Sequence, residues 1–231
     1  MALTDKLTAI ADAIRARTGS TSQLTLDQMP NAIGEIKNTQ FYNFLNNQPF
    51  DVTADDFGSE TSLDAAKFKD SSIASIEIPY GTRFRTIPAE CFCGCGKLKT
   101  VKFLTWTDSL GDTYCEVKTI GTKAFYSTDL TSLNLPSSLT TIGDQAFYGS
   151  TLNIDLVIPA NVTSIGDQAF CNTFVKTVTF ETATPSSLTI NPTAFSYCGN
   201  LTDIYVPWAA GAVANAPWGA TSATIHYNSG V

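Results

Sequence analysis

A six-residue pattern ending in phenylalanine recurs six times along this chain of 231 residues. The copies cover residues 63–68, 87–92, 120–125, 142–147, 165–170 and 190–195, and their phenylalanines lie 24, 33, 22, 23 and 25 positions apart. A period of this size is typical of a solenoid, in which each unit buries its apolar face only by stacking on its neighbours. The sequence therefore predicts a stack of coils, and it weakens an interpretation as an enzyme because solenoids mostly offer extended binding surfaces.

Each repeat has three parts. The first is an extended run, exemplified by Leu133 and Leu135 on one face of a strand that Pro136 ends. The second is a short strand with an inward pair, such as Leu139 and Ile142. The third is the turn that carries the six-residue pattern. The same inward positions of the first run are predicted in the other repeats at Ile76 and Ile78, Val101 and Phe103, Leu156 and Ile158, Val178 and Phe180, and Ile204 and Val206.

The turn has its own chemistry. Three copies place glycine directly after isoleucine, where we expect a tight bend with positive φ, at Gly121, Gly143 and Gly166. A short side chain with a free oxygen follows, at Asp144, Asp167 and Asn191. We expect these oxygens to cap a one-turn helix that leads into the phenylalanine.

The repeat pattern L-x-x-I-x-(I/L)-P-x-x-(V/L)-T-x-I-G-x-x-A-F resembles the BspA-like leucine-rich repeats over about residues 61–207. The departures are Lys67 and Cys91 at the alanine position, Glu181 in place of proline, and a longer repeat around Trp106. The resemblance implies a right-handed β-solenoid that presents a sheet, usually on cell-surface or secreted adhesins. The predicted fold class is thus a β-rich right-handed solenoid with a short N-terminal α-helical segment.

The N-terminal helix is predicted from four apolar residues spaced 4, 3 and 4 apart, namely Leu3, Leu7, Ile10 and Ile14. A second short helix is expected to begin at Pro30. An isolated helix of two heptads has marginal stability, so we expect the apolar stripe to be buried in a contact. The contact would be either a helical hairpin within the chain or another molecule. Residues 3–36 also resemble the start of many tail-associated proteins of phages and prophages of Gram-positive gut bacteria, which implies attachment or oligomerisation.

We therefore expect three parts. Residues 1–40 form a helical attachment or oligomerisation segment, residues 41–206 form a solenoid of about six repeats whose first is degenerate, and residues 207–231 form a C-terminal cap. In the cap, Trp208 and Trp218 are expected to cover the last coil, and residues 224–227 to add a closing strand.

Charge and composition exclude several partner classes. The net charge is −7 and no Lys/Arg cluster is present, which argues against nucleic acid. No stretch approaches the roughly 18 apolar residues of a membrane span, so we expect no membrane insertion. Residues 1–6 do not resemble a signal peptide, so we expect synthesis and folding in the bacterial cytoplasm.

No catalytic, cofactor or metal site is predicted. The C-x-C-x-C run at residues 91–95 has no histidine nearby and fits a zinc site poorly. Cys91 occupies the alanine position, and Cys95 and Cys198 occupy a small inward position, so core cysteine is the favoured interpretation. His226, the one histidine, lacks a nucleophile motif, and the recurrence of Gly-Asp-Gln in two turns indicates a structural role.

The candidate binding surface is the outer face of the first strand of each repeat. Side chains between the inward positions point outward. They form one predicted row across six coils, namely Glu77, Lys102, Asn134, Val157, Thr179 and Tyr205, and beside it a second, namely Ser75, Thr100, Ser132, Asp155, Thr177 and Asp203. Trp106 lies in an insertion of the kind that often forms a binding loop. The alternatives are a merely solvated sheet and a Trp106 folded back on the solenoid.

Three functions follow from these features. The first is a non-enzymatic binding and structural protein of a phage or prophage tail. Its partners would be a host cell-surface glycan or protein, other tail or baseplate proteins, and further copies of the chain through the N-terminal helix. The second is a bacterial BspA-like adhesin at the cell surface or outside the cell. The third, a polysaccharide-degrading enzyme, rests only on analogy with other solenoids.

Overall fold

The computed structural model describes residues 49–54, 62–81, 84–110, 113–182 and 185–228. Residues 51–231 belong to one compact unit. The described residues form a β-solenoid, as the repeats predict, and contain no α-helix. Within these residues there is no helix of the length and hydropathy that a membrane span needs. The predicted N-terminal helices and the residues Leu3, Leu7, Ile10 and Ile14 lie outside the described residues.

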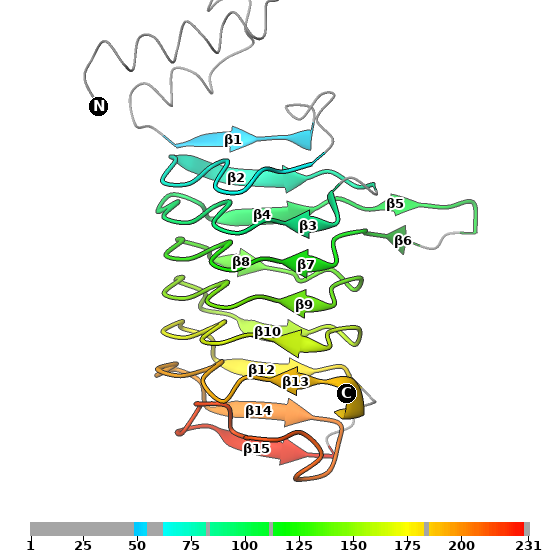
Figure 1. Ribbon diagram of the computed structural model, residues 1–231, viewed down its shortest axis with the longest axis vertical. Helices are drawn as coiled ribbons and strands as arrows, with labels where there is room; N and C mark the ends of the chain where they lie inside the picture. The colour runs from blue at the N-terminus through cyan, green and yellow to red at the C-terminus, as the bar shows by residue number, and fades with distance from the viewer. Residues whose placement is uncertain (1–48, 55–61, 82–83, 111–112, 183–184, 229–231) are drawn as a thin grey trace, which may run out of the picture. The chain divides into compact units, whose positions relative to one another are not determined.

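The longer strands stack as two parallel sheets on one side of the solenoid (Figure 1). One sheet has the order β1-β2-β4-β8, with strands Phe50–Val52, Ile73–Ile78, Thr100–Phe103 and Ser132–Leu133. The other has the order β10-β12-β14-β15, with strands Asp155–Ile158, Thr177–Phe180, Asp203–Val206 and Thr224–Tyr227. Register within each sheet joins equivalent repeat positions, for example Ile76 with Val101 and Val178 with Ile204.

The second strand of each repeat joins a separate sheet of two-residue strands. Its order is β13-β11-β9-β7-β3, with strands Thr189–Ile190, Ser164–Ile165, Thr141–Ile142, Thr119–Ile120 and Thr86–Ile87. The isoleucine of each strand is buried, as expected. A short 3₁₀ turn, Pro185–Ser187, precedes the last of these strands, and the hairpin β5–β6, Trp106–Thr107 and Thr113–Tyr114, lies outside the stack.

One additional residue interrupts the long sheet. Leu152 and Leu156 are four positions apart, whereas the equivalent Leu130 and Leu133 are three apart. The additional residue lies just before β10, where the hydrogen-bonded sheet is interrupted. The long sheet divides between β8 and β10, so strand pairing joins the predicted outer row in two parts rather than across all six coils. This is a correction to the single surface expected from the sequence.

A column of phenylalanine rings forms the core on the turn side. Consecutive rings have centroids 5.1–5.3 Å apart and planes within 2–8° of parallel. The column consists of Phe68, Phe92, Phe125, Phe147, Phe170 and Phe195, and all but the first are fully buried. The ring spacing is close to the distance between paired strands, so each coil contributes one ring to a continuous core.

The glycines of the turn have a different role from the one expected. Positive φ falls two residues later, at Lys123, Gln145 and Gln168, with φ of 56°, 55° and 52°. A Cβ on Gly143 would lie 2.8 Å from the backbone of the preceding coil. Gly121 and Gly166 are crowded in the same way. Glycine is therefore required because neighbouring coils approach closely, which the sequence of one repeat cannot reveal.

The turn side chains that were expected to cap helices form hydrogen bonds between coils in two of three cases. The turns contain no helix to cap, and the Asp144 carboxylate accepts a hydrogen bond from the backbone N–H of Asp167 in the next coil, at 2.8 Å. Thr193 Oγ1 donates to the carboxylate of Asp167 in the same direction. Only Asn191 accepts locally, from Thr193 N–H at 3.1 Å. These side chains join coils, because the close stacking places the next turn within reach.

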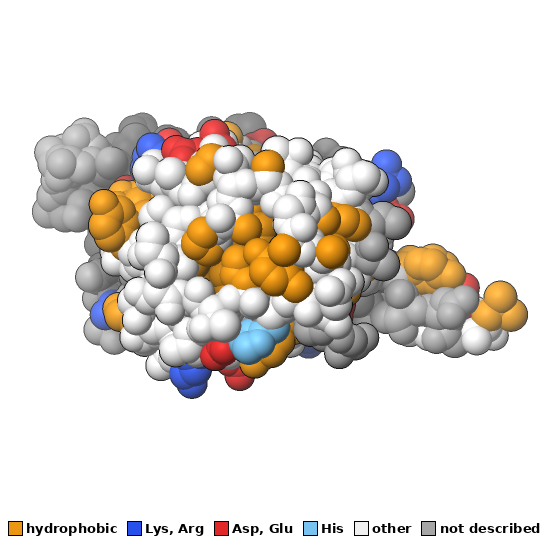
Figure 2. All heavy atoms as spheres, turned by 90° about the horizontal axis from the view of Figure 1, so that it is seen from below, with side chains coloured by type: hydrophobic (Ala, Val, Ile, Leu, Met, Phe, Trp, Pro, Cys, Tyr) orange, Lys and Arg blue, Asp and Glu red, His pale blue; other side chains and the backbone are white. Residues whose placement is uncertain are grey.

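The C-terminal segment closes the stack. Trp208 and Trp218 are buried, and both rings contact Phe180, with centroids 5.4 and 5.6 Å from it. The strand expected over residues 224–227 is present as β15, parallel to β14. Figure 2 views this end of the solenoid and shows apolar side chains gathered in its centre.

The cysteines lie in the core, as the repeat register indicates. Cys91, Cys95, Cys171 and Cys198 are buried, and all six cysteines are free. Cys95 Sγ donates to the Phe68 carbonyl at 2.9 Å, and Cys198 Sγ donates to the Phe170 carbonyl at 3.1 Å. Burial raises the pKa of the Cys91 thiol to about 12, so it stays neutral at physiological pH.

Replacement of Phe147 by alanine is expected to lower the free energy of unfolding by about 3–5 kcal/mol, because a buried ring between two stacked neighbours is lost. Urea denaturation followed by circular dichroism measures this change. A loss under about 1 kcal/mol would show that Phe147 does not carry the core.

Gly143→Ala is expected to destabilise the fold by about 1–3 kcal/mol, because its methyl group overlaps the backbone of the preceding coil. Gly96→Ala is the matched control, since a Cβ at Gly96 would meet nothing within 4 Å. Equal effects of the two substitutions on urea denaturation would refute the close-approach explanation.

Ellman's reagent, in mildly alkaline buffer, is expected to label the half-buried Cys93 and Cys115 before the four buried thiols. The buried thiols, Cys91 above all, should react only on unfolding, because burial disfavours the thiolate that attacks the reagent. Mass spectrometry of partially labelled protein assigns each site. Rapid labelling of Cys91 in the native protein would contradict this placement.

Candidate ligand-binding face

The outer rows of side chains follow strand register within each sheet. In the first sheet, Glu77 pairs with Lys102, and Asn134 follows the end of β8 as an exposed side chain. In the second sheet, Thr179 lies between Val157 and Tyr205. The second row is arranged in the same way, with Ser75, Thr100 and Ser132 in one sheet and Asp155, Thr177 and Asp203 in the other. Strand register brings the predicted residues together in two groups.

The charges of the first group compensate each other. Lys102 Nζ lies 3.0 Å from Glu77 Oε1, and the hydrogen bond from Lys102 lowers the pKa of the Glu77 carboxyl. Both side chains are solvent-accessible, so the pair adds little stability. Its consequence is electrostatic: Lys102 does not create a positive patch on this face.

The second group ends in an aromatic pair that the sequence did not indicate. β15 adds His226 beside Tyr205, and the two rings stack with centroids 4.6 Å apart. His226 Nε2 lies 2.7 Å from Asp203 Oδ1, and Thr202 Oγ1 donates to Asp203 Oδ2 at 2.7 Å. The His226 contact is the main cause that lowers the pKa of Asp203. His226 is more than 20 positions from Tyr205 and Asp203 in the sequence, and the pairing of β15 with β14 brings it beside them.

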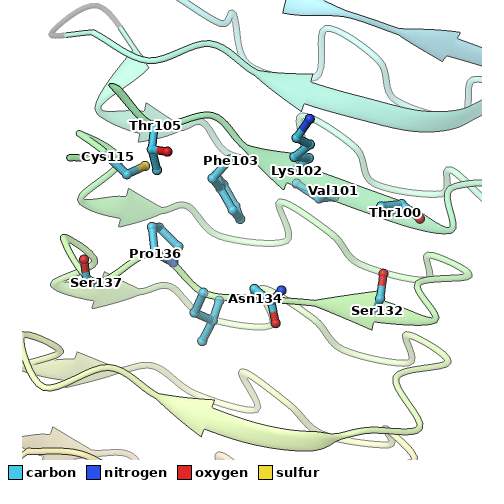
Figure 3. Close-up of a pocket in the computed structure, with 11 residues that line it drawn as sticks. Thr100, Val101, Lys102, Phe103, Thr105, Cys115, Ser132, Asn134, Pro136 and Ser137 are labelled. Atoms are coloured by element: carbon cyan, nitrogen blue, oxygen red, sulfur yellow. The ribbon is translucent and has the colours of Figure 1, made fainter. Parts of the chain in front are cut away.

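A hollow of about 450 Å³ opens between β4 and the chain that follows β8 (Figure 3). Two predicted binding residues, Lys102 and Asn134, line it together with Thr105 and Cys115. Its apolar lining includes Phe103 and Leu135, which were expected in the core and are instead half-buried. This is a correction to the inward pattern of those two repeats.

The hollow exists because two strands separate early. β4 and β8 pair only at Thr100 with Ser132 and Val101 with Leu133. On the neighbouring coil the inserted hairpin begins just after β4, and it leads the chain away from the stack at this point (Figure 1). The two chains diverge, and the side chains that would have met in the core line an opening.

The insertion forms an exposed hairpin beside this hollow. Trp106 and Tyr114 face each other across β5 and β6, and their rings stack with centroids 5.1 Å apart. Trp106 is 43% exposed and Tyr114 is 41% exposed. Tyr114 Oη donates to Asp108 Oδ2 at 3.0 Å, an interaction that raises the pKa of Tyr114. The hairpin projects from the stack in Figure 1, so Trp106 is not folded back over the solenoid.

The described residues contain no group of three or more potential metal-ligating side chains. His226 contacts Asp203 and Tyr205, which accounts for its position without a catalytic role. This face offers hydrogen-bonding groups such as Asn134 and Thr179, and aromatic rings such as Tyr205 and Trp106.

The solved structures similar to this chain include three proteins with leucine-rich repeats or a leucine-rich sequence. A leucine-rich repeat protein from Bacteroides ovatus is 30% identical, with a TM-score of 0.47, over 64% of this chain and 35% of that one. One from Eubacterium ventriosum is 26% identical, with a TM-score of 0.45, over 58% and 32%. A leucine-rich cell surface protein from Faecalibacterium prausnitzii is 19% identical, with a TM-score of 0.40, over 82% and 62%. This chain thus spans about a third of the length of the first two.

A search of curated proteins found no match. The profile of the BspA-type leucine-rich repeat region matches residues 12–116 and 117–213, with six copies. Together with the repeated turn and the parallel strands of equivalent register, this match establishes that the chain belongs to the BspA-type leucine-rich repeat family.

Proposed function

We propose that this chain is a non-enzymatic binding protein that recognises a glycan or a protein at a cell surface. The observation that carries the proposal is the hollow of about 450 Å³ on the sheet face, next to a hairpin with two exposed, stacked aromatic rings. The hairpin and about half of the hollow's lining come from the one repeat that departs most from the regular length. Departures from a regular repeat that add exposed aromatic surface are characteristic of recognition sites.

The size and lining of the hollow support ligand binding. Its volume lies within the range of about 300–1,000 Å³ that small-molecule sites occupy. Phe103 and Leu135 offer apolar contact, and Asn134 offers an amide donor and acceptor. Trp106 and Tyr114 add rigid aromatic area, which contributes strongly to binding energy because few rotatable bonds are immobilised.

The charge distribution favours a neutral or weakly charged ligand. Glu77 compensates Lys102, and the chain as a whole is acidic. A polyanionic ligand would be repelled by the net charge of −7 unless a local positive patch were present. Neutral glycans and uncharged protein surfaces remain as the ligand classes that fit.

Membership in the BspA-type family supports the location, because solenoids of this family usually belong to cell-surface or secreted adhesins. Proteins of the family are also generally non-enzymatic. The comparisons lend no support to a role in a phage tail, so the virion location and tail partners stay predictions from residues 3–36 alone. Self-association through Leu3, Leu7, Ile10 and Ile14, and the three-part division at residues 40 and 206, are likewise proposals.

Binding of fluorescently labelled protein to bacterial and mammalian cells, read by flow cytometry, tests the proposed face. Trp106→Ala is expected to weaken binding by at least about tenfold, because an exposed aromatic anchor is removed. Asn134→Ala and Tyr205→Ala should weaken it less. The melting temperature should stay nearly unchanged, since all three side chains lie outside the core.

Phe174→Ala is the matched control, because Phe174 is an aromatic residue that is 49% exposed and does not line the hollow. It should bind as the wild-type protein does. If all three face variants bind normally while the wild-type protein binds cells, recognition lies elsewhere on the molecule and the proposed face is wrong.

A further inference from the structure

A second hollow lies on the turn side, between the last two coils, and none of the rows on the sheet contributes to it. Its volume is about 400 Å³, and its lining consists of Asn172, residues 197–199 and residues 219–222. None of the eight lining residues is charged. The volume lies within the range of small-molecule sites, and the lining combines an aromatic ring with several hydroxyl and amide groups.

Tyr197 breaks a rule that the other repeats follow. The position two residues after the phenylalanine has positive φ in all six copies, where it is held by Asp70, Gly94, Ser127, Gly149, Asn172 and Tyr197. Glycine and short polar residues tolerate this conformation, whereas a large aromatic residue is strained there. The φ of Tyr197 is 58° and its side chain is 83% exposed, so burial does not offset the strain. The ring therefore lies outside the core, at the edge of the hollow.

The phenylalanine column ends at Phe195, and the residue at the next phenylalanine position lines the hollow. Phe195 N–H donates to the Trp218 carbonyl at 2.9 Å, which matches the bond from Phe170 N–H to the Ala194 carbonyl one coil earlier. Gly219 therefore stands where each preceding coil has phenylalanine. A Cβ at Gly219 would lie 2.2 Å from Ser196 Oγ, so the last turn lies directly against the previous one. Without a ring at Gly219 the column stops, and the hollow lies beside Tyr197.

The chemistry of this lining fits a sugar. An aromatic face is partly negative and packs against the C–H groups of a pyranose ring. The hydroxyls of Thr221 and Ser222, the amide of Asn172 and the phenol of Tyr197 supply donors and acceptors of the kind that sugar hydroxyls need. A charged ligand would lack a counter-charge in this lining, and desolvation would then oppose its binding.

We propose that this hollow binds one neutral sugar residue, free or at the end of a glycan, with Tyr197 as the stacking surface. The site is separate from the sheet face. Its occupancy does not depend on Trp106 or Asn134, so the two proposals fail or succeed independently.

Saturation-transfer NMR with D-glucose, D-galactose, D-mannose and N-acetyl-D-glucosamine tests the site, with N-acetylneuraminic acid as an anionic comparison. At least one neutral sugar should receive saturation from the wild-type protein, and the anionic sugar should receive none. Tyr197→Gly should weaken that binding by at least about tenfold. The same variant should raise the melting temperature by about 2 °C, because glycine relieves the strain at positive φ.

Asn172→Gly is a second variant that keeps the favoured φ and removes an amide from the lining, so it should also weaken binding. Tyr80→Ala is the matched control, since Tyr80 is an exposed tyrosine outside the hollow, and it should leave sugar binding unchanged. The proposal is overturned if no neutral sugar binds, or if Tyr197→Gly binds as the wild type does.

Discussion

Close contact between successive coils is the constraint on which the rest of this structure depends. Rings of the phenylalanine column lie 5.1–5.3 Å apart, and the turns that carry them are joined by backbone hydrogen bonds such as Phe125 N–H to the Ala146 carbonyl, at 2.7 Å. This distance leaves no space for a Cβ at Gly121, Gly143 or Gly166. It also places the Asp144 carboxylate on the next coil. A single repeat therefore has no stable form of its own, because the ring stacking and strand pairing that bury its core require a neighbour.

The regular repeats and the irregular ones serve different purposes. Regular coils supply a rigid stack whose outer side chains follow strand register. The hollow on the sheet lies where the pairing of β4 and β8 ends, next to the inserted hairpin. The hollow on the turn side lies where Gly219 replaces a phenylalanine. Each candidate site thus includes a position where the repeat is irregular. The regular coils on either side hold the lining residues in place.

Charged groups on the surface are arranged between coils rather than along them. Lys69 with Glu90, Arg85 with Glu116, and Lys102 with Glu77 each join one coil to the next. Such exposed pairs contribute little to stability individually, yet each compensates a positive charge that could attract anions. The two hollows consequently depend on polar and aromatic contact, which suits uncharged ligands.

The sequence alone determined the solenoid, its six coils, the inward isoleucines and the phenylalanine column. It could do so because the period and the hydrophobic pattern are local properties that recur in every repeat. It also indicated the exposed outer rows and the closing strand at residues 224–227. Other features required the tertiary structure. The crowding at Gly143, the division of the sheet before β10, the exposure of Phe103 and Leu135, and the stacking of Tyr205 on His226 all depend on how one coil meets the next. Contacts between coils join residues 20 or more positions apart. A cavity beside an irregular coil therefore cannot be predicted from the pattern of a single repeat.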